Sequence, residues 1–160
     1  QIQKNQSTFQ GILKECVENI IKQKNVNIIG SGRTDSGVHA LGQVFNMKIE
    51  TSMNESQVVK AMNAKLPKDI HLVSSEIKRD DFNARFSASK REYLYKIKKS
   101  VSPFDYKYYW NYRYGYDLEV LKKCAKVILK KRNFYNFCRP SEDVRNYDCI
   151  INSSNWTVIN

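Results

Sequence analysis

The chain is most informative at the apolar run Val26-Asn27-Ile28-Ile29, which leads directly into the polar, glycine-rich stretch Gly30-Ser31-Gly32-Arg33-Thr34-Asp35-Ser36-Gly37-Val38-His39-Ala40. An apolar run of strand length that stops at glycine is typical of a strand followed by a loop. Beyond the loop, Phe45, Met47 and Ile49 stand at alternate positions, which predicts a second strand with one face in water. These residues therefore predict two strands joined by a long irregular loop.

Helices are predicted where apolar residues recur with the helical period. The first follows a capping box with Ser7 as N-cap and Gln10 as its partner, and its apolar stripe is Phe9, Ile12, Leu13, Cys16, Val17, Ile20 and Ile21. The second covers about 56–65, ends before Pro67 and turns inward Val58, Val59 and Met62. The third follows Asp117 as its cap, with a stripe of Leu118, Leu121, Cys124, Ala125 and Ile128.

Further strands are predicted over 70–77, 91–99 and 148–159, whereas 100–116 is expected to be irregular and 133–147 to be a loop. The 160 residues, 41% of them hydrophobic, are enough for one ordinary domain or two small lobes sharing a sheet, and they exclude a disordered tail. The predicted fold class is α+β, with a mixed, mainly antiparallel sheet and helices packed on one face.

The chain is strongly basic, with 27 Lys and Arg residues against 16 Asp and Glu residues and a formal net charge of +11. Such an excess usually attracts a polyanion, most often nucleic acid and otherwise an anionic membrane surface. The charges are scattered rather than gathered on one amphipathic helix, which argues against the membrane. A merely solvated Lys-rich surface is the alternative. No apolar run approaches the ~20 residues of a membrane span, and no signal stretch opens the chain, so we expect a soluble, intracellular protein.

The cysteines are widely spaced and form no Cys-x-x-Cys pair: Cys16, Cys124, Cys138 and Cys149. Cys16 and Cys124 fall on predicted apolar helical faces, where a free thiol packs as a small hydrophobic group. Only His39 and His71 could join them as ligands, so no metal site is predicted. A reducing compartment fits best.

The loop that opens at Gly30 carries one guanidinium and one carboxylate, Arg33 and Asp35, two positions apart. A carboxylate beside an arginine stays ionised, which suits a nucleophile better than a proton donor. The structural alternative is a tight turn in which Asp35 caps backbone amides and Arg33 pairs with it. A phosphate cradle is disfavoured because neither the P-loop nor the dinucleotide-binding spacing is present.

A second cluster places Arg85 between Phe82 and Phe86, and Tyr93 follows shortly after. The planar guanidinium of Arg85 could donate two hydrogen bonds to a phosphate or stack on a base. Tyr93 could stack on a base or accept a proton. The alternatives are that both phenylalanines belong to the core and that the tyrosine simply covers the sheet. The aromatic stretch over 106–116 fits RNA stacking and an ordered loop equally well.

The sequence over 32–40 together with Leu41-Gly42-Gln43-Val44 resembles the signature of the TruA family of tRNA pseudouridine synthases. Later segments resemble further family motifs in the same order: Asn63-Ala64-Lys65-Leu66-Pro67-Lys68-Asp69-Ile70, Asp81-Phe82-Asn83-Ala84-Arg85-Phe86-Ser87-Ala88, Arg91-Glu92-Tyr93-Leu94-Tyr95 and Asn133-Phe134-Tyr135-Asn136-Phe137-Cys138. The resemblance covers essentially all of 7–160. The last of these segments ends in Asn136-Phe137-Cys138, and this ending favours the eukaryotic branch of the family, which modifies the anticodon stem-loop.

The resemblance implies a role for each matching residue. Asp35 takes the place of the nucleophilic aspartate, and Tyr93 that of the active-site tyrosine that stacks on the target base. Arg33 matches the arginine that accompanies nucleotide flipping, and Arg85 a basic position near the cleft. The implied partner is tRNA, with no metal or organic cofactor and no membrane, and the family's habit implies a homodimer. The implied location is the cytoplasm or nucleus, with an organelle left open.

The physics of the reaction agrees with these roles. A paired base must be flipped out at a cost of a few kcal/mol, and an aromatic face can return ~1–3 kcal/mol by stacking. A net charge of +11 should attract phosphates in a salt-dependent way. The alternative from another class is a non-catalytic RNA-binding module that keeps the scaffold without the chemistry.

The resemblance also has departures. Family members usually open with a strand that carries a Tyr-Asp-Gly and Gly-Trp-Gln pattern, and no such pattern precedes Ser7. They also continue into a segment with a His-Met-Val-Arg-like motif, whose arginine pairs with the catalytic aspartate, and no such motif precedes the end at Asn160. We therefore expect a fragment of a pseudouridine synthase fold in which Asp35 lacks its arginine partner. Its N-terminal catalytic lobe would cover 1–100 with the Asp35 loop, and 101–160 would begin an incomplete second lobe.

Overall fold

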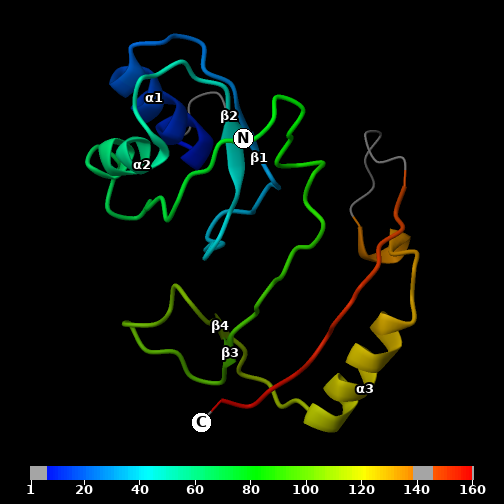
Figure 1. Ribbon diagram of the computed structural model, residues 1–160. Coiled ribbons are helices and arrows are strands. Elements are labelled where there is room, and N and C mark those ends of the chain that lie inside the picture. Colours follow the sequence, from blue (N-terminus) through cyan, green and yellow to red (C-terminus); the bar gives the residue numbers. More distant parts are fainter. Residues whose placement is uncertain (1–6, 139–145, 160) are drawn as a thin grey trace. The chain divides into compact units, whose positions relative to one another are not determined.

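The computed structural model describes residues 7–138 and 146–159 (Figure 1). The chain divides between Tyr95 and Lys96 into two compact units. The predicted loop over 133–147 lies partly outside the described residues. No helix in the described part of the chain combines the length and apolarity that a membrane span requires.

The first helix, α1, covers Phe9–Ile21, as its apolar stripe predicts. Its N-cap is Thr8 rather than the predicted Ser7, because the Thr8 side-chain oxygen accepts a hydrogen bond from the Gly11 amide at 3.2 Å. The expected capping box is also wrong, since the Gln10 side chain donates instead to the carbonyl of Ile28 at 2.7 Å. That bond ties the first helical turn to the strand that follows the helix in the chain.

The predicted strand–loop–strand unit is confirmed. Strand β1 (Ile28–Gly30) pairs antiparallel with β2 (Phe45–Met47), with Ile28 opposite Met47 and Gly30 opposite Phe45. Helices α1 and α2 (Glu55–Asn63) lie side by side and cover one side of this strand pair (Figure 1). The helices therefore pack on one face of the sheet in this unit, as the sequence predicts.

Helix α2 begins with a complete capping box. The Asn54 side chain accepts from the Gln57 amide at 3.0 Å, and the Gln57 side chain accepts from the Asn54 amide at 2.9 Å. Met62 is fully buried on the inner side of this helix. The buried core between the helices and the strands consists of Cys16, Val17, Val26, Ile28, Val58, Met62 and Leu72.

The strand predicted over 70–77 is wrong, because this segment finds no partner strand in the described part of the chain. The Asn63 side chain takes the place of a neighbouring strand. Its Oδ1 accepts from the Leu72 amide at 2.8 Å, and its Nδ2 donates to the Leu72 carbonyl at 2.9 Å. Leu72 is thereby buried against α2 without belonging to a sheet.

In the second unit the predicted strand over 91–99 shortens to β3 (Ile97–Lys98). Its partner is β4 (Trp110–Asn111), which pairs parallel to it within the stretch that was expected to be irregular. Lys98 also bonds to the Asp105 carboxylate in the connection between the strands. The hydrogen-bonded ammonium of Lys98 lowers the pKa of the Asp105 carboxyl, and the bond raises the pKa of Lys98 in turn.

The aromatic side chains around β4 are largely exposed. Trp110 packs on Tyr112 with ring centroids 5.1 Å apart, and Tyr112 packs on Tyr114 at 5.6 Å. Trp110 and Tyr114 remain 60% and 75% exposed. The rings therefore contact one another more than they fold onto a core.

Helix α3 (Leu118–Leu129) begins as predicted, because the Asp117 side chain accepts from the amides of Glu119 and Val120. Cys124, predicted to pack as an apolar residue, is exposed, whereas Ala125 alone is buried among the described residues of this unit. A short 3-10 helix, η1, covers Tyr135–Phe137.

The final strand predicted over 148–159 is wrong. Its described residues form only an isolated bridge between Asn133 and Asp148. No neighbouring strand is available to extend this pairing among the described residues. The fold class itself is confirmed as mixed α+β, and the described residues form one antiparallel and one parallel strand pair.

Candidate active site

The predicted site loop over 32–40, called the 32–40 loop below, leaves the sheet where β1 and β2 separate. The Ser31 amide donates to the Val44 carbonyl at 2.8 Å, just beyond the last paired residues. Gln43 fastens the base of the loop, because its Nε2 donates to the Gly32 carbonyl at 2.8 Å and its Oε1 accepts from the Ser31 hydroxyl at 3.1 Å. The ends of the loop are thereby fixed to each other, and the residues between them are exposed.

Asp35 begins a tight turn within this loop. The amide of Val38 donates to the Asp35 carbonyl at 3.2 Å, and Gly37 has a φ of 82°. Glycine enters this left-handed region without the strain that a Cβ would bring, so it suits the turn. The side chains of Arg33 and Asp35 are both exposed.

The contacts of the structural alternative for Asp35 are absent from the described residues 7–138 and 146–159. No ion pair there joins Arg33 to Asp35, and no amide donates to the Asp35 carboxylate. The turn is held by its backbone and by Gly37 instead. Its geometry therefore does not require a carboxylate at this position.

The second predicted cluster forms a turn over 83–87, called the 83–87 turn below. A backbone bond from the Ser87 amide to the Asn83 carbonyl closes it at 2.7 Å. Ala84 is 2% exposed, and its amide donates to the Oδ1 of Asn46 on β2 at 2.8 Å. The turn is thus anchored to the sheet through one buried backbone group.

Arg85 is exposed beside this anchor, with its guanidinium 5.5 Å from the centre of the Phe86 ring. The alternative that both phenylalanines belong to the core is wrong for Phe86, since its side chain is 79% exposed, whereas Phe82 is half-buried. Ala84 occupies the buried position of the turn and leaves Phe86 on the outside. A guanidinium and a ring are therefore both open to a base or a phosphate.

Arg91 joins the two predicted parts of the site. Its Nη2 donates to the Ser31 carbonyl at 2.7 Å and to the Arg85 carbonyl at 3.0 Å. The backbones that carry Arg33 and Arg85 are thereby brought together. The sequence places Arg91 within a motif but predicts no role for it, because partners that are backbone carbonyls leave no residue pattern to recognise.

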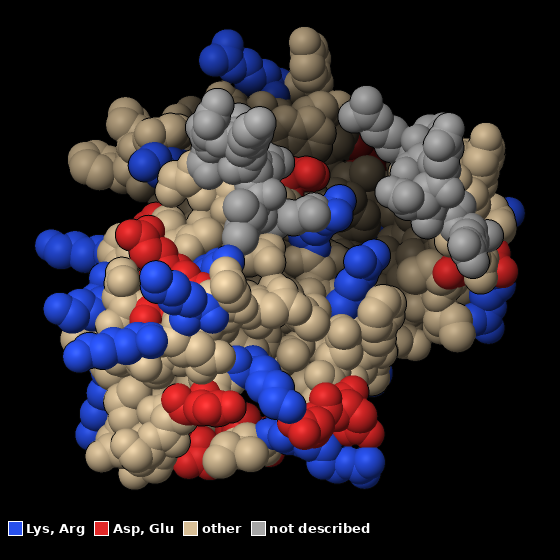
Figure 2. Space-filling model, turned by 90° about the horizontal axis from the view of Figure 1, so that it is seen from above, with Lys and Arg blue, Asp and Glu red and all other residues tan. Residues whose placement is uncertain are grey.

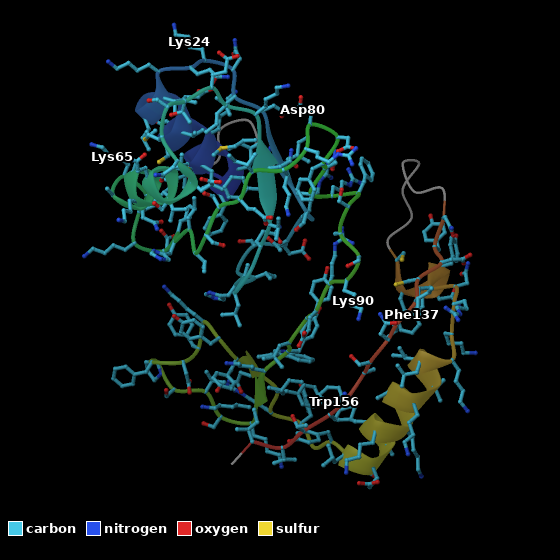
Figure 3. The ribbon with its side chains drawn as sticks, viewed as in Figure 1. Lys24, Lys65, Asp80, Lys90, Phe137 and Trp156 are labelled. Atoms are coloured by element: carbon cyan, nitrogen blue, oxygen red, sulfur yellow. The ribbon has the colours of Figure 1, made fainter. Side chains whose placement is uncertain are left out.

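Tyr93 follows Arg91 on the segment whose start is marked by Lys90 in Figure 3. Its ring is 67% exposed, and no strand forms at this position for it to cover. Within the described ranges, no hydrogen bond or ring contact links Tyr93 to Asp35. The structure therefore brings the 32–40 loop, which contains Arg33 and Asp35, close to the 83–87 turn, which contains Arg85. Tyr93 lies on the segment that follows the turn.

The surface beside the 83–87 turn carries a shallow hollow and charged side chains of both signs. A shallow hollow of about 240 Å³ lies against the 83–87 turn and is lined by Lys78, Arg79, Asp81, Phe82 and Ser87. On the face shown in Figure 2, Lys and Arg side chains are spread over the surface, with acidic side chains among them. Across the described residues, no group of three or more His, Cys, Asp or Glu side chains is placed to hold a metal ion.

Comparison with known proteins gives a consistent picture. A family model described as tRNA pseudouridine synthase matches residues 1–87. The tRNA pseudouridine synthase A of Lacticaseibacillus casei is 37% identical over 139 residues, which are 86% of this chain and 56% of that protein. The proteins of the same name from Bacillus licheniformis and Bacillus subtilis are 34% and 35% identical over 160 residues, 98% of this chain and 65% of each protein.

The chain thus spans between 56% and 65% of the length of these relatives. All three relatives are bacterial, and the predicted lean toward the eukaryotic branch stays a prediction. The matched residues include the 32–40 loop and the 83–87 turn.

Proposed function

The chain belongs to the tRNA pseudouridine synthase family, and from this premise we propose that it takes part in the isomerisation of uridine to pseudouridine in tRNA. In this reaction the uracil leaves its ribose at nitrogen, turns and rejoins through carbon. The ring carbon that forms the new bond to the ribose loses a proton, and the ring nitrogen that left the ribose gains one. The atoms therefore balance without a cofactor. The names of the relatives support this choice of substrate and reaction.

We propose Asp35 as the nucleophile. The single observation that carries the proposal is the state of its carboxylate, which is exposed on a glycine-containing turn and has no ion pair among the described residues. A nucleophile must reach the substrate, and a carboxylate engaged in capping the turn could not do so. The match of the surrounding loop to the family signature supports the same role.

We propose that Arg33, Arg85 and Tyr93 bind the substrate. Arg33 would accompany the flipping of the target nucleotide, which costs a few kcal/mol when the base is paired. The exposed ring of Tyr93 would stack on the flipped base, a contact typically worth about 1–3 kcal/mol. Arg85 would contact a phosphate, since its guanidinium is exposed and the chain has a net charge of +11.

Three finer points are also proposed. The target uridine lies in the anticodon stem-loop, a proposal that rests on the short sequence Asn136-Phe137-Cys138. The enzyme acts as a homodimer, as the family resemblance implies. It works inside the cell, in the cytoplasm, the nucleus or an organelle, because that is where tRNA is modified.

The test is pseudouridine formation in an unmodified tRNA transcript, measured by mass spectrometry of the digested RNA. The variants are Asp35→Asn, which removes the charge at nearly constant shape, and Asp80→Asn as the matched control. Asp80 is also an exposed aspartate, 3.3 Å from Lys48, but lies outside the proposed site. Binding of tRNA is measured in parallel by fluorescence anisotropy at several salt concentrations.

Turnover that is lost in Asp35→Asn and kept in Asp80→Asn supports the proposal. Turnover that survives in Asp35→Asn refutes Asp35 as nucleophile. Salt-sensitive tRNA binding without turnover in any variant, wild type included, favours the alternative of a non-catalytic RNA-binding module. If the wild type neither binds nor modifies tRNA, both functions are wrong for this chain.

A further inference from the structure

Arg91 makes contacts that its exposure would not suggest. Its residue surface is largely exposed, yet one terminal nitrogen, Nη2, donates to two backbone carbonyls. The Ser31 carbonyl is 2.7 Å away and 60 positions distant in sequence, and the Arg85 carbonyl is 3.0 Å away and six positions distant. Arg91 therefore holds together two segments that the sequence separates widely.

The chemistry of a guanidinium suits this arrangement. Nη2 carries two hydrogens in the plane of the group, so it can donate one to each carbonyl at a fixed angle. Both bonds are assisted by the positive charge. The guanidinium also lies close to Gly32, because its Nε is 3.8 Å from the point where a Cβ on that glycine would stand.

The other bonds around the site do not provide this link. Gln43 fixes the two ends of the 32–40 loop to each other. Asn46 fixes the 83–87 turn to β2. Among the described residues, the side chain that ties Ser31, the residue directly before the 32–40 loop, to the 83–87 turn is Arg91.

We propose that Arg91 is a positioning residue that holds the loop with Arg33 and Asp35 at a fixed distance from Arg85. The inference rests on the proposed function, since it assigns these side chains to one substrate site. Ser31 precedes Arg33 by two positions and Asp35 by four, so releasing its carbonyl loosens the part of the loop that carries both. A misplacement of about 1 Å can cost a reaction about 100-fold in rate.

The test compares Arg91→Ala, Arg91→Lys and the control Arg79→Ala in the whole chain. Arg79 is another exposed arginine, bonded to Asp81 at 2.9 Å, and no bond among residues 7–138 and 146–159 joins its side chain to the loop. NMR relaxation gives the backbone order parameters over 32–38, which are about 0.85 for a rigid segment and below about 0.6 for a flexible one. Steady-state kinetics on tRNA separate kcat from KM, and urea unfolding monitors overall stability.

We expect Arg91→Ala to lower the order parameters over 32–38 toward 0.6 and to reduce kcat by about 10- to 100-fold. KM for tRNA and the urea midpoint should stay close to wild type. Arg91→Lys should recover part of kcat, because an ammonium can reach the carbonyls but lacks the fixed plane. Arg79→Ala should change none of these quantities.

Unchanged order parameters in Arg91→Ala would overturn the proposal, whatever the activity. A parallel loss of kcat and of the urea midpoint would also overturn it, because that pattern indicates a merely structural role. If the wild type forms no pseudouridine, the proposed function fails, and the order parameters alone then decide whether Arg91 fixes the loop. The two failures are therefore distinguishable.

Discussion

Replacing Asn46 by alanine should release the 83–87 turn from the sheet. The Oδ1 of Asn46 accepts from the Ala84 amide at 2.8 Å, and Ala84 is only 2% exposed. Alanine at position 46 leaves this amide without its acceptor in a place that water hardly reaches. An unsatisfied buried donor costs about 1–3 kcal/mol.

The cost can be read at the Ala84 amide itself. Hydrogen exchange through local opening depends on the free energy that separates the closed from the open state. Since about 1.4 kcal/mol corresponds to a tenfold change, a cost of about 1–3 kcal/mol predicts that exchange of the Ala84 amide becomes roughly 5- to 150-fold faster. NMR measures this in Asn46→Ala, and the amides within α2 serve as an internal reference because their bonds are untouched.

The control variant is Asn46→Asp, which keeps an acceptor oxygen at the same position. It should leave the Ala84 amide protected, whereas Asn46→Ala should not. Equal exchange of this amide in the wild type and in Asn46→Ala would refute the argument, because the bond would then contribute nothing to holding the turn. Faster exchange in both variants would show that strand β2 itself, rather than the acceptor, had been disturbed.

Three further predictions concern the core, a thiol and an ion pair. Met62 is fully buried, so Met62→Ala should lower the free energy of unfolding by about 2–5 kcal/mol in urea denaturation; a loss below about 1 kcal/mol would contradict its place in the core. Burial raises the pKa of the Cys16 thiol, with Lys65 opposing in part, so iodoacetamide at neutral pH should spare Cys16 in mass spectra and modify the exposed Cys124, Cys138 and Cys149. Equal modification of every cysteine would be incompatible with a buried Cys16. Lys98 lowers the pKa of the Asp105 carboxyl, so the stability from this pair should be complete above the unfolded-state pKa and lost as the pH falls through the lower folded-state pKa. Thermal unfolding from neutral to acid pH should show this loss in the wild type and not in Asp105→Asn, and identical profiles would argue against it.

The helices could be predicted because their signals are local. The apolar stripe behind Thr8, the cap of α3 at Asp117 and the inward Met62 all follow from neighbours within a few turns. An error of one residue at the first N-cap has the same origin, since Ser7 and Thr8 are both good caps and only the bond to Gly11 distinguishes them.

The strands were predicted less well because a strand needs a partner that local sequence does not supply. The segment over 70–77 has strand-like residues, yet Asn63 satisfies the Leu72 backbone in place of another strand. The reverse error occurs at Trp110–Asn111, which pairs with β3 although its surroundings show no clear alternation. Which segments pair is decided by what the fold brings beside them.

For the candidate site, the sequence by itself determined which chemical groups are present: a guanidinium and a carboxylate on one glycine-rich loop, a second guanidinium beside a phenylalanine, and a tyrosine after them. Residue identity and spacing along one short segment are sufficient for that. Only the tertiary structure decided which of these groups come together, through Asn46 and Arg91. Both side chains bind backbone groups far away in sequence. A backbone carbonyl or amide is the same in every residue, so no pattern of side chains could have revealed the link.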